Sequence, residues 1–467
     1  MVQTQLVGSL IAALGVSMSL LAIGHALLYK RRPQSAFGWI AVCFTLPLLG
    51  PVLYYVFGIN RVELRARKLF TGQPETLCPI TFAATAPTGL EALGQLGLAV
   101  TAWPLVAGNS IEVLHDGAAA FPAMLDTIRN ARRRLYFSTY ILDSGPVGRE
   151  FAAELGAATR RGVDVRVLID GVGALYSWPR ARRMLEREGV RCATFLPPRL
   201  VPPSFSVNLR NHRKILVADG AIALTGGANI RERYLPTPGE DSPRIRDMHF
   251  RLQGPIAAQI EAVFRHDWQF VTGEADLVQV VDFERAGSAV CRAVAEGPDM
   301  DRLTELLVGA IGNARRRIAI MTPYFLPPRE MMAPLQAAAL QGVDVTVILP
   351  AENNLPYVHR ASRHMLWELV RRRVNVYYQP PPFVHSKLFY IDDDYAQIGS
   401  ANIDSRSLRL NFELNVEVYD RRFVGVLHDH FTHVREQSRK VTLEELDGRS
   451  LATKLIDGGA WLFAPYL

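Results

Sequence analysis

The hydrophobic pattern of the first 60 residues differs from that of the rest of the chain. Residues 5–29 and 33–60 contain no Asp, Glu, Lys or Arg, and the basic stretch Lys30-Arg31-Arg32 separates them. Each apolar stretch is longer than the roughly 20 residues with which a helix crosses a bilayer. No Lys or Arg precedes the first stretch and a second follows it, which is unlike a cleaved signal peptide. The pattern predicts a two-helix transmembrane hairpin over residues 1–60.

Beyond this segment the pattern changes to alternating helices and strands. Residues 61–108 carry scattered Pro and Gly and are predicted to form a linker. Helical patterns, such as those over 121–134 and 302–317, then alternate with short strands rich in Val, Ile, Leu and Tyr. This alternation is typical of an α/β domain whose helices pack on a largely parallel or mixed sheet. Residues 441–467 are predicted to be a C-terminal tail that packs on the core or touches a bilayer surface.

An internal duplication organises the α/β part. The sequence Asn-Ala-Arg-Arg-Arg at 130–134 recurs at 313–317, and Gly-Val-Asp-Val at 162–165 recurs at 342–345. The offsets of 183 and 180 residues fit copies of a whole domain and are too long for solenoid repeats. We therefore predict two similar α/β domains in tandem.

Composition narrows the class of protein. Of 467 residues, 49% are hydrophobic and 21% charged, which allows a sizeable core and excludes global disorder. Lys and Arg outnumber Asp and Glu by 52 to 45, giving a net charge of +7. A basic chain favours acidic partners, and both nucleic acid and anionic lipid fit. The four cysteines have no paired spacing, so neither a disulfide framework nor a structural zinc site is expected.

Both halves of the duplicated region carry one histidine-lysine-aspartate motif. Its spacing is His-x-Lys-x-x-x-x-Asp, with a glycine 14 and an asparagine 17 residues after the histidine. One copy could arise by chance, but two matched copies within a duplication are a specific signal. The members are His212, Lys214, Asp219, Gly226 and Asn229 in the first half, and His385, Lys387, Asp392, Gly399 and Asn402 in the second.

These residue types suit a phosphate group. In a strand, residues two apart share a face, so each histidine and its lysine point the same way. Lysine and asparagine bind phosphate oxygens, and glycine lets the backbone approach them. If the two half-sites face each other, one histidine can attack phosphorus while the other protonates the departing oxygen. The sequence contains no nucleotide-binding phosphate loop and no metal-carboxylate cluster, so no metal or other cofactor is expected.

The two aspartates complete the candidate catalytic motif, but we assign them a different role. Asp219 and Asp392 come at strand ends before turns, where aspartate often accepts hydrogen bonds from nearby backbone. We predict that they fix loops and take no part in the chemistry.

The paired motifs resemble those of the phospholipase D superfamily, and the chain is similar to bacterial cardiolipin synthases over nearly its whole length. One departure concerns the glycine turn, which reads Gly226-Gly227 in the first half and Gly399-Ser400 in the second. The missing hydroxyl puts the equivalence of the two half-sites in doubt. The resemblance rests on residues 39–58, 211–214, 246–249, 254–255, 267–268, 297–299, 322–325, 399–407 and 411–413.

The resemblance implies a fold of two α-β-α sandwich domains, over residues 109–275 and 276–440, that form a pseudo-two-fold bilobal unit. It also implies roles for the motif residues. His212 would be the nucleophile that forms a phosphatidyl-enzyme, and His385 the general acid and then the general base. The phosphate oxygens would be held by Lys214, Lys387, Asn229 and Asn402.

Two carboxylates would orient the histidines. By the same resemblance, Glu413 corresponds to the carboxylate that orients His385, and Asp247 is its counterpart for His212. A carboxylate in this place fixes the tautomer of an imidazole and stabilises its protonated form. The alternative is that both carboxylates form surface salt bridges.

The implied reaction is phosphatidyl transfer between two phosphatidylglycerol molecules, with release of glycerol, by a multi-pass protein of the bacterial inner membrane. Three alternatives share parts of this pattern. A membrane-bound hydrolase would use the same intermediate and release phosphatidic acid. A phosphodiesterase or nuclease would fit the basic charge, but a nucleic acid partner gives no reason for two membrane spans, and none is expected. A non-catalytic membrane scaffold would not need both motifs intact.

Overall fold

The structure is a computed structural model, and the chain divides into two units, residues 1–71 and 72–467. Some of the residues discussed above lie outside the described ones: Arg31, Arg32, Asn60, residues 61–82 of the predicted linker, Asp299, and the last three residues of the tail. The described residues are 2–30, 33–59, 83–198, 209–236, 239, 243–274, 285–298 and 300–464.

The N-terminal unit contains one helix long enough to cross a bilayer. Helix α1 (Val2–Tyr29) has 28 residues, and residues 5–29 within it are apolar enough to span. At 1.5 Å per residue the whole helix is about 40 Å long, more than the roughly 30 Å of a bilayer core. It is the only such helix among the described residues.

The second predicted span is not one continuous helix, which corrects the expectation of a simple hairpin. It divides into α2 (Pro33–Thr45), α3 (Leu49–Leu53) and a π-helical turn, η1 (Tyr54–Gly58). The break falls around Pro47, whose nitrogen cannot donate a helix hydrogen bond. This segment packs on α1, where the hydroxyl of Ser19 donates to the carbonyls of Cys43 (2.9 Å) and Pro47 (3.1 Å).

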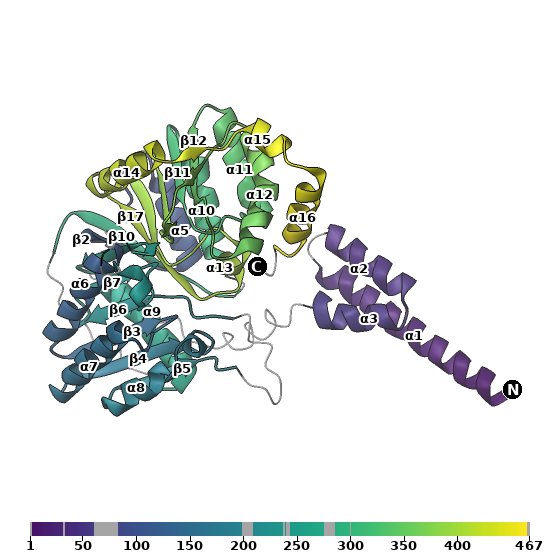
Figure 1. Cartoon of the computed structure of the whole chain (residues 1–467), viewed down its shortest axis with the longest axis horizontal. Coiled ribbons are helices and arrows are strands. Elements are labelled where there is room, and N and C mark those ends of the chain that lie inside the picture. The colour runs from purple at the N-terminus through teal and green to yellow at the C-terminus, as the bar shows by residue number, and fades with distance from the viewer. Residues whose placement is uncertain are drawn as a thin grey trace. The chain divides into compact units, whose positions relative to one another are not determined.

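The second unit is built on one continuous mixed sheet of two lobes, as Figure 1 shows in blue to teal and in green to yellow. The first lobe has the order β5-β4-β3-β6-β7-β9-β2, and the second repeats it as β13-β12-β11-β15-β16-β17-β10. The identical order confirms the duplication. The strands of the first lobe are β2 (Leu105–His115), β3 (Arg134–Thr139), β4 (Asp164–Asp170), β5 (Arg191–Phe195), β6 (Ile215–Ala218), β7 (Ile222–Gly226) and β9 (Met248–Gln253).

The lobes join where β2 pairs antiparallel with its counterpart β10. In each lobe three strands are parallel, β3-β4-β5 and β11-β12-β13, and the others are antiparallel, so the sheet is mixed, which is one of the two predicted arrangements. Short strands β1 (Ala83–Ala84) and β18 (Arg439–Lys440) pair with β2 and β13. The second-lobe strands are β10 (Ala289–Glu296), β11 (Arg317–Met321), β12 (Asp344–Pro350), β13 (Asn375–Gln379), β15 (Leu388–Ile391), β16 (Tyr395–Gly399) and β17 (Glu413–Tyr419).

Helices bury the sheet and create a hydrophobic core in each lobe. Strands β3, β6, β15 and β17 are buried along their whole length, as expected when both faces of a sheet are covered. Phe137 and Phe151 lie in the core of the first lobe, and Ile320 and Leu335 in that of the second. The longer helices are α6 (Asp116–Asn130), α7 (Pro146–Arg160), α9 (Ile256–Thr272), α10 (Arg302–Asn313), α11 (Arg329–Leu340), α12 (Pro356–Arg371) and α14 (Arg421–Glu436).

Part of the segment predicted as a linker is folded. Helix α5 (Glu91–Thr101) packs on α10, and Leu93 lies in the core of the second lobe. The glycines that suggested a linker serve close packing instead. A Cβ atom on Gly97 would lie 1.6 Å from the buried guanidinium of Arg292, which also donates to the carbonyl of Gly94 at 3.0 Å.

The C-terminal tail is also helical. Helix α15 (Leu443–Asp447) is followed by α16 (Leu451–Leu462), and both pack against α12. Figure 1 shows α16 in yellow beside α12. The part of the tail that the structure describes therefore packs on the second lobe, which is one of the two predicted outcomes.

Candidate active site

The two motif histidines occupy equivalent places at the edge of the sheet. His212 lies just before β6 and His385 just before β15. The end of β3 pairs with the start of β6 through Ser138 and Ile215, and Met321 of β11 pairs with Leu388 in the same way. Both histidines therefore lie at the edge where the parallel strands end, which is the usual place for a ligand site in an α/β sheet.

Short backbone pairings between the lobes hold the histidines together. Strand β8 (Ile245–Arg246) pairs in parallel with β14 (Phe383–Val384), and the amide of His385 donates to the carbonyl of Arg246 at 2.7 Å. The other side repeats this arrangement, because Asn211 bridges Phe412 and the amide of His212 donates to the Phe412 carbonyl at 2.9 Å.

Each histidine is bound by a carboxylate from the opposite lobe. His212 Nδ1 lies 2.9 and 3.0 Å from the two oxygens of Glu413, and His385 Nδ1 lies 2.9 Å from Asp247 Oδ2. This exchanges the expected partners, since Glu413 was assigned to His385 and Asp247 to His212. The reason is the pairing between the lobes, which places residue 413 next to residue 212 and residue 247 next to residue 385.

A carboxylate beside Nδ1 favours the same tautomer in both imidazoles. An Nδ1–H that donates to a carboxylate leaves the lone pair on Nε2, the atom needed for attack or proton transfer. The side chains of His212 and His385 are 14% and 9% exposed. Burial lowers the pKa of His212, and it lowers the pKa of His385 to about 4, so both rings are neutral near pH 7.

Both motif lysines are buried beside their histidines. Lys214 Nζ donates to the carbonyl of His212 at 2.7 Å, and Lys387 Nζ donates to the carbonyl of His385. Burial lowers the pKa of Lys214 to about 7 and that of Lys387 to about 8. The charge of Lys387 also lowers the pKa of His212, and that of Lys214 lowers the pKa of His385, so the two half-sites share one environment.

The surroundings of the two carboxylates differ. Glu413 accepts hydrogen bonds from the hydroxyl of Ser400 and from Asn411 Nδ2, at 2.5 and 3.0 Å. Burial alone would raise the pKa of Glu413, but His212, Lys214 and Ser400 together lower it. Gly227 occupies the place of Ser400 in the first lobe. A Cβ atom there would lie 2.5 Å from Asp247 Oδ1, so the glycine leaves room for that carboxylate.

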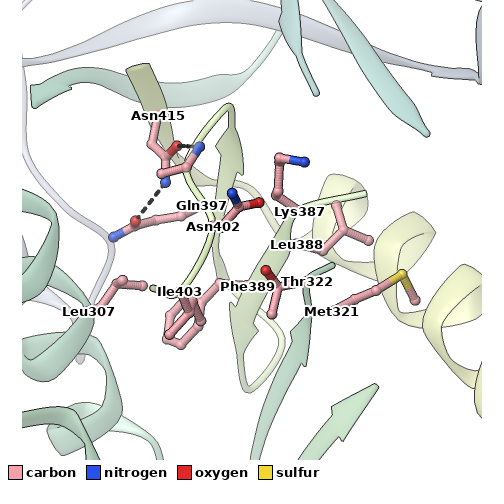
Figure 2. Close-up of a pocket in the computed structure, with 11 residues that line it drawn as sticks. Leu307, Met321, Thr322, Lys387, Leu388, Phe389, Gln397, Asn402, Ile403 and Asn415 are labelled. Carbon is pink, nitrogen blue, oxygen red and sulfur yellow. Dashed lines mark hydrogen bonds between the residues drawn. The ribbon is translucent and has the colours of Figure 1, made fainter. Parts of the chain in front are cut away.

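The two motif asparagines have different partners. Asn229 Oδ1 accepts from the amide of Ile141 at 3.3 Å. Asn402 Nδ2 donates to Ser407 Oγ at 3.2 Å, and its Oδ1 has no partner within the described structure. Figure 2 shows Asn402 and Lys387 lining one small pocket. The two asparagines, Asn229 and Asn402, both remain candidate ligands for phosphate.

The motif aspartates hold loops, in agreement with their assigned role. Asp219 accepts hydrogen bonds from three successive backbone amides, those of residues 132–134, at 2.8 to 3.0 Å. Asp392 does the same for residues 315–317, at 2.7 to 3.0 Å. These bonds tie the turn after each motif strand to the Asn-Ala-Arg-Arg-Arg repeat, so the repeat marks a structural contact.

Several residues of the site were missed by sequence reasoning. The ring of Tyr140 lies 5.4 Å from that of His212, and Tyr234 and Tyr324 lie 6.4 and 6.3 Å from His385. The carboxylate of Asp170, at the end of β4, accepts from the amide of Asn211 at 2.8 Å. Three of them share a signal of position, because Tyr140, Asp170 and Tyr324 come at or within three residues of the end of a strand, whereas Tyr234 lies in a short 3-10 helix.

Arg213, the residue between His212 and Lys214, binds the lobes together. Its guanidinium forms a buried ion pair with Asp267 and donates to the backbone carbonyls of Glu413 and Glu296, at 3.0 and 2.7 Å. The motif was treated as variable at this position, so nothing in the pattern indicated this role.

Two histidine-lysine pairs from duplicated lobes, each histidine held by the other lobe, define a phosphotransfer enzyme of the phospholipase D type. Residues 124–268 and 307–435 match the family model described as "Cardiolipin synthase, PLD-like domain", and residues 18–58 match "Phospholipase D-nuclease N-terminal". Cardiolipin synthase A of Pseudomonas putida is 32% identical over 439 residues, covering 90% of this chain and 91% of that protein. The major cardiolipin synthase of Bacillus subtilis is 29% identical over 484 residues, covering 99% and 100%.

The chain therefore belongs to the cardiolipin synthase family. Among solved structures, the phosphatidylserine synthase of Haemophilus influenzae matches with a TM-score of 0.62 at 18% identity, covering 80% of this chain and 100% of that one. At this identity the likeness supports the duplicated fold alone.

Proposed function

We propose that the chain transfers a phosphatidyl group from one phosphatidylglycerol to the terminal glycerol hydroxyl of a second, which forms cardiolipin and releases glycerol. The observation that carries this proposal is the pair of imidazoles, each held by a carboxylate of the opposite lobe, beside two buried lysines. Membership of the cardiolipin synthase family supports the choice of lipid.

In the first step the lone pair of His212 Nε2 attacks phosphorus. The bond from phosphorus to the glycerol oxygen breaks, and His385 gives that oxygen a proton, so neutral glycerol leaves. Lys214 and Lys387 bind the phosphate oxygens and balance their negative charge. Glu413 stabilises the positive charge that develops on His212, since it already accepts from Nδ1.

In the second step the incoming hydroxyl of another phosphatidylglycerol gives its proton to His385 and attacks phosphorus. The bond between phosphorus and His212 Nε2 breaks, which regenerates the nucleophile. The phosphorus–nitrogen bond keeps the energy of the broken ester available, so transfer requires no nucleotide. Two successive displacements retain the configuration at phosphorus.

The acid role of His385 requires a proton that the isolated site does not favour. Burial and the charge of Lys387 lower its pKa to about 4. An anionic phosphodiester between the lysines offsets the charge of Lys387 and raises that pKa, because an opposite charge nearby favours the protonated form. Asp247 then holds the resulting imidazolium. Substrate binding itself therefore prepares the general acid.

The enzyme is proposed to act at the bacterial inner membrane as a multi-pass protein. Helix α1 crosses the bilayer, and the broken second segment, α2 to η1, returns through it while packed on α1. At 13 residues α2 is about 20 Å long, so the return needs α3 and η1 as well.

Lipid product analysis tests the proposed reaction. The full chain is incubated in phosphatidylglycerol vesicles, and the products are identified by mass spectrometry for wild type and His212→Ala together. We expect cardiolipin and glycerol from the wild type and neither from the variant. Phosphatidic acid as the main wild-type product would replace the transferase by a hydrolase.

A further inference from the structure

Helix α16 turns its apolar side outward. Its acidic residue, Asp457, is fully buried and accepts hydrogen bonds from Arg363 at 2.8 Å and Arg449 at 2.7 Å. A helix on the surface of a soluble protein has the opposite arrangement, with apolar residues inside and charges in water. Five large apolar side chains of α16 and the residue after it are 54–73% exposed: Leu451, Leu455, Ile456, Leu462 and Phe463.

The C-terminal end of α16 lies close to the active site. Trp461 and Ala464 join a small apolar cluster with Val358 of α12 and with Tyr324. The ring of Tyr324 is 6.3 Å from that of His385. The exposed side chains at positions 462 and 463 lie at the end of α16 that joins this cluster.

The second lobe exposes further apolar side chains after β12. Leu355 ends the loop that follows β12 and Tyr357 lies in the first turn of α12, and they are 45% and 71% exposed. The hydroxyl of Tyr324 donates to Asn354 in the same loop at 2.8 Å, which ties the loop to the tyrosine beside His385. The loop leads directly into α12, on which α16 packs.

The first lobe presents an equivalent loop, which follows β4. Its Leu175, Tyr176 and Trp178 are 54%, 57% and 81% exposed. The ring of Tyr176 lies 6.4 Å from Tyr140, whose ring is 5.4 Å from His212. Because β4 and β12 are counterparts in the duplication, each half-site has its own exposed apolar loop at the same edge of the sheet.

Basic residues accompany the apolar side chains. Arg180 and Arg183 are exposed directly after the first-lobe loop, and Lys454 is exposed on α16. Aromatic and aliphatic side chains next to Arg and Lys are the composition with which proteins bind an anionic membrane surface. Trp and Tyr in particular favour the head-group region of a bilayer.

We propose that residues 175–178, residues 355–357 and the outward face of α16 form a docking rim that inserts into the surface of a bilayer containing anionic phospholipid. The proposal rests on the proposed function in one respect, because a lipid substrate explains why the rim surrounds the active site. With the rim seated, the phosphate of a lipid reaches the histidines while its acyl chains stay in the bilayer.

Charge substitutions in the full chain test the rim. Trp178→Asp, Tyr357→Asp and Leu462→Asp are compared with Leu340→Asp. Leu340 is a matched control because it is 51% exposed and ends α11, before the start of β12 at the opposite edge of the sheet. Tyr357→Asp places an acid in the first turn of α12, where it favours the helix dipole, so loss of folding would not explain its effect.

Two substrates separate docking from chemistry. On phosphatidylglycerol in vesicles, we expect each rim variant to lose about fivefold or more of the rate, since each loses apolar contact with the bilayer. On short-chain, monomeric phosphatidylglycerol the rates should stay within about twofold of the wild type, and Leu340→Asp should change neither. Unchanged vesicle rates, or equal losses on both substrates, would overturn the proposal.

Depth-dependent quenching gives a result that does not need turnover. A fluorophore is attached at position 178 or 462, or at 340 as the control, in full-length protein reconstituted in vesicles that contain brominated lipid. Quenching at 178 and 462 but not at 340 supports the rim even if no cardiolipin forms, so failure of the proposed reaction remains distinguishable. The proposal is contradicted if the fluorophores at 178 and 462 are not quenched. It is also contradicted if a second copy of the chain covers these positions and shields them from the lipid.

Discussion

The exchanged carboxylates determine what each side chain does. Glu413 holds His212, the proposed nucleophile, and has Ser400 and Asn411 as further donors, whereas Asp247 holds His385, the proposed general acid, and has a glycine in the place of the serine. The doubt about the equivalence of the two half-sites is thereby explained. The half-sites are alike in backbone, but the serine hydroxyl supports only Glu413, the carboxylate that holds His212.

A substrate with a good leaving group tests this exchange. A phosphatidyl ester of p-nitrophenol needs no proton on its leaving oxygen, so its first step needs the nucleophile but no general acid. We expect Asp247→Asn to release about one p-nitrophenol per enzyme in a burst and then stall, since the second step needs the base. Glu413→Gln should lose about a hundredfold or more of the burst rate. A burst from Glu413→Gln and none from Asp247→Asn would instead support the pairing expected from the sequence, in which Asp247 orients the nucleophile.

For the p-nitrophenyl ester, whose first step needs no proton from His385, the pKa values predict a bell-shaped dependence of kcat/KM on pH. The acid side reflects protonation of His212, whose pKa burial lowers below its usual value, so activity is lost only below about pH 6.5. The alkaline side reflects loss of protons from Lys214 and Lys387, with pKa values of about 7 and 8, which removes the charges that bind phosphate.

Monomeric short-chain substrate gives this profile without interference from the bilayer charge. Because an arginine keeps its charge, Lys214→Arg should move the alkaline limb of its remaining activity upward. Constant kcat/KM up to about pH 9.5 in the wild type would show that the lysine charges are not needed.

At the scale of the secondary-structure elements, the motif aspartates fasten one loop to another through hydrogen bonds. Asp219 and Asp392 each join three backbone amides of one segment to a turn at positive φ, 55° and 48°. Replacing Asp219 by alanine leaves those amides without their acceptor and puts alanine in a left-handed conformation, so unfolding should become easier by about 1–3 kcal/mol. Asp219→Asn keeps one oxygen and should lose less.

Thermal melting and activity together separate this fastening role from chemistry. We expect a lowered apparent melting temperature for Asp219→Ala and a kcat within about threefold of the wild type at low temperature. A wild-type melting curve combined with lost activity would assign the aspartate to catalysis instead.

The sequence predicted those elements that leave a periodic or repeated signal. The duplication and both motifs could be predicted because they recur at fixed offsets, and the alternation of helices and strands indicated the α/β class. The pairing of β8 with β14 could not, since each has two residues and no pattern, and this pairing decides which carboxylate meets which histidine. Gly97 resembled a linker glycine because the chain alone does not show that Arg292 packs against it.

At the scale of the whole molecule, the two duplicated lobes form one continuous sheet. The lobes join through β2 and β10, and each contributes a histidine, a lysine and the carboxylate that orients the other lobe's histidine. Neither lobe alone therefore contains an oriented imidazole. This mutual dependence explains why the duplicated domains share one chain and one site.

Mapping the covalent intermediate tests the convergence of two imidazoles on one phosphorus most directly. Full-length enzyme is mixed with phosphatidylglycerol, quenched during turnover under conditions that preserve phosphohistidine, and digested for mass spectrometry. We expect the phosphatidyl group on His212 in the wild type, and none on the enzyme in His212→Ala. The mechanism would be contradicted by a phosphatidyl group on His385. It would also be contradicted if the wild-type enzyme formed product without any covalent intermediate.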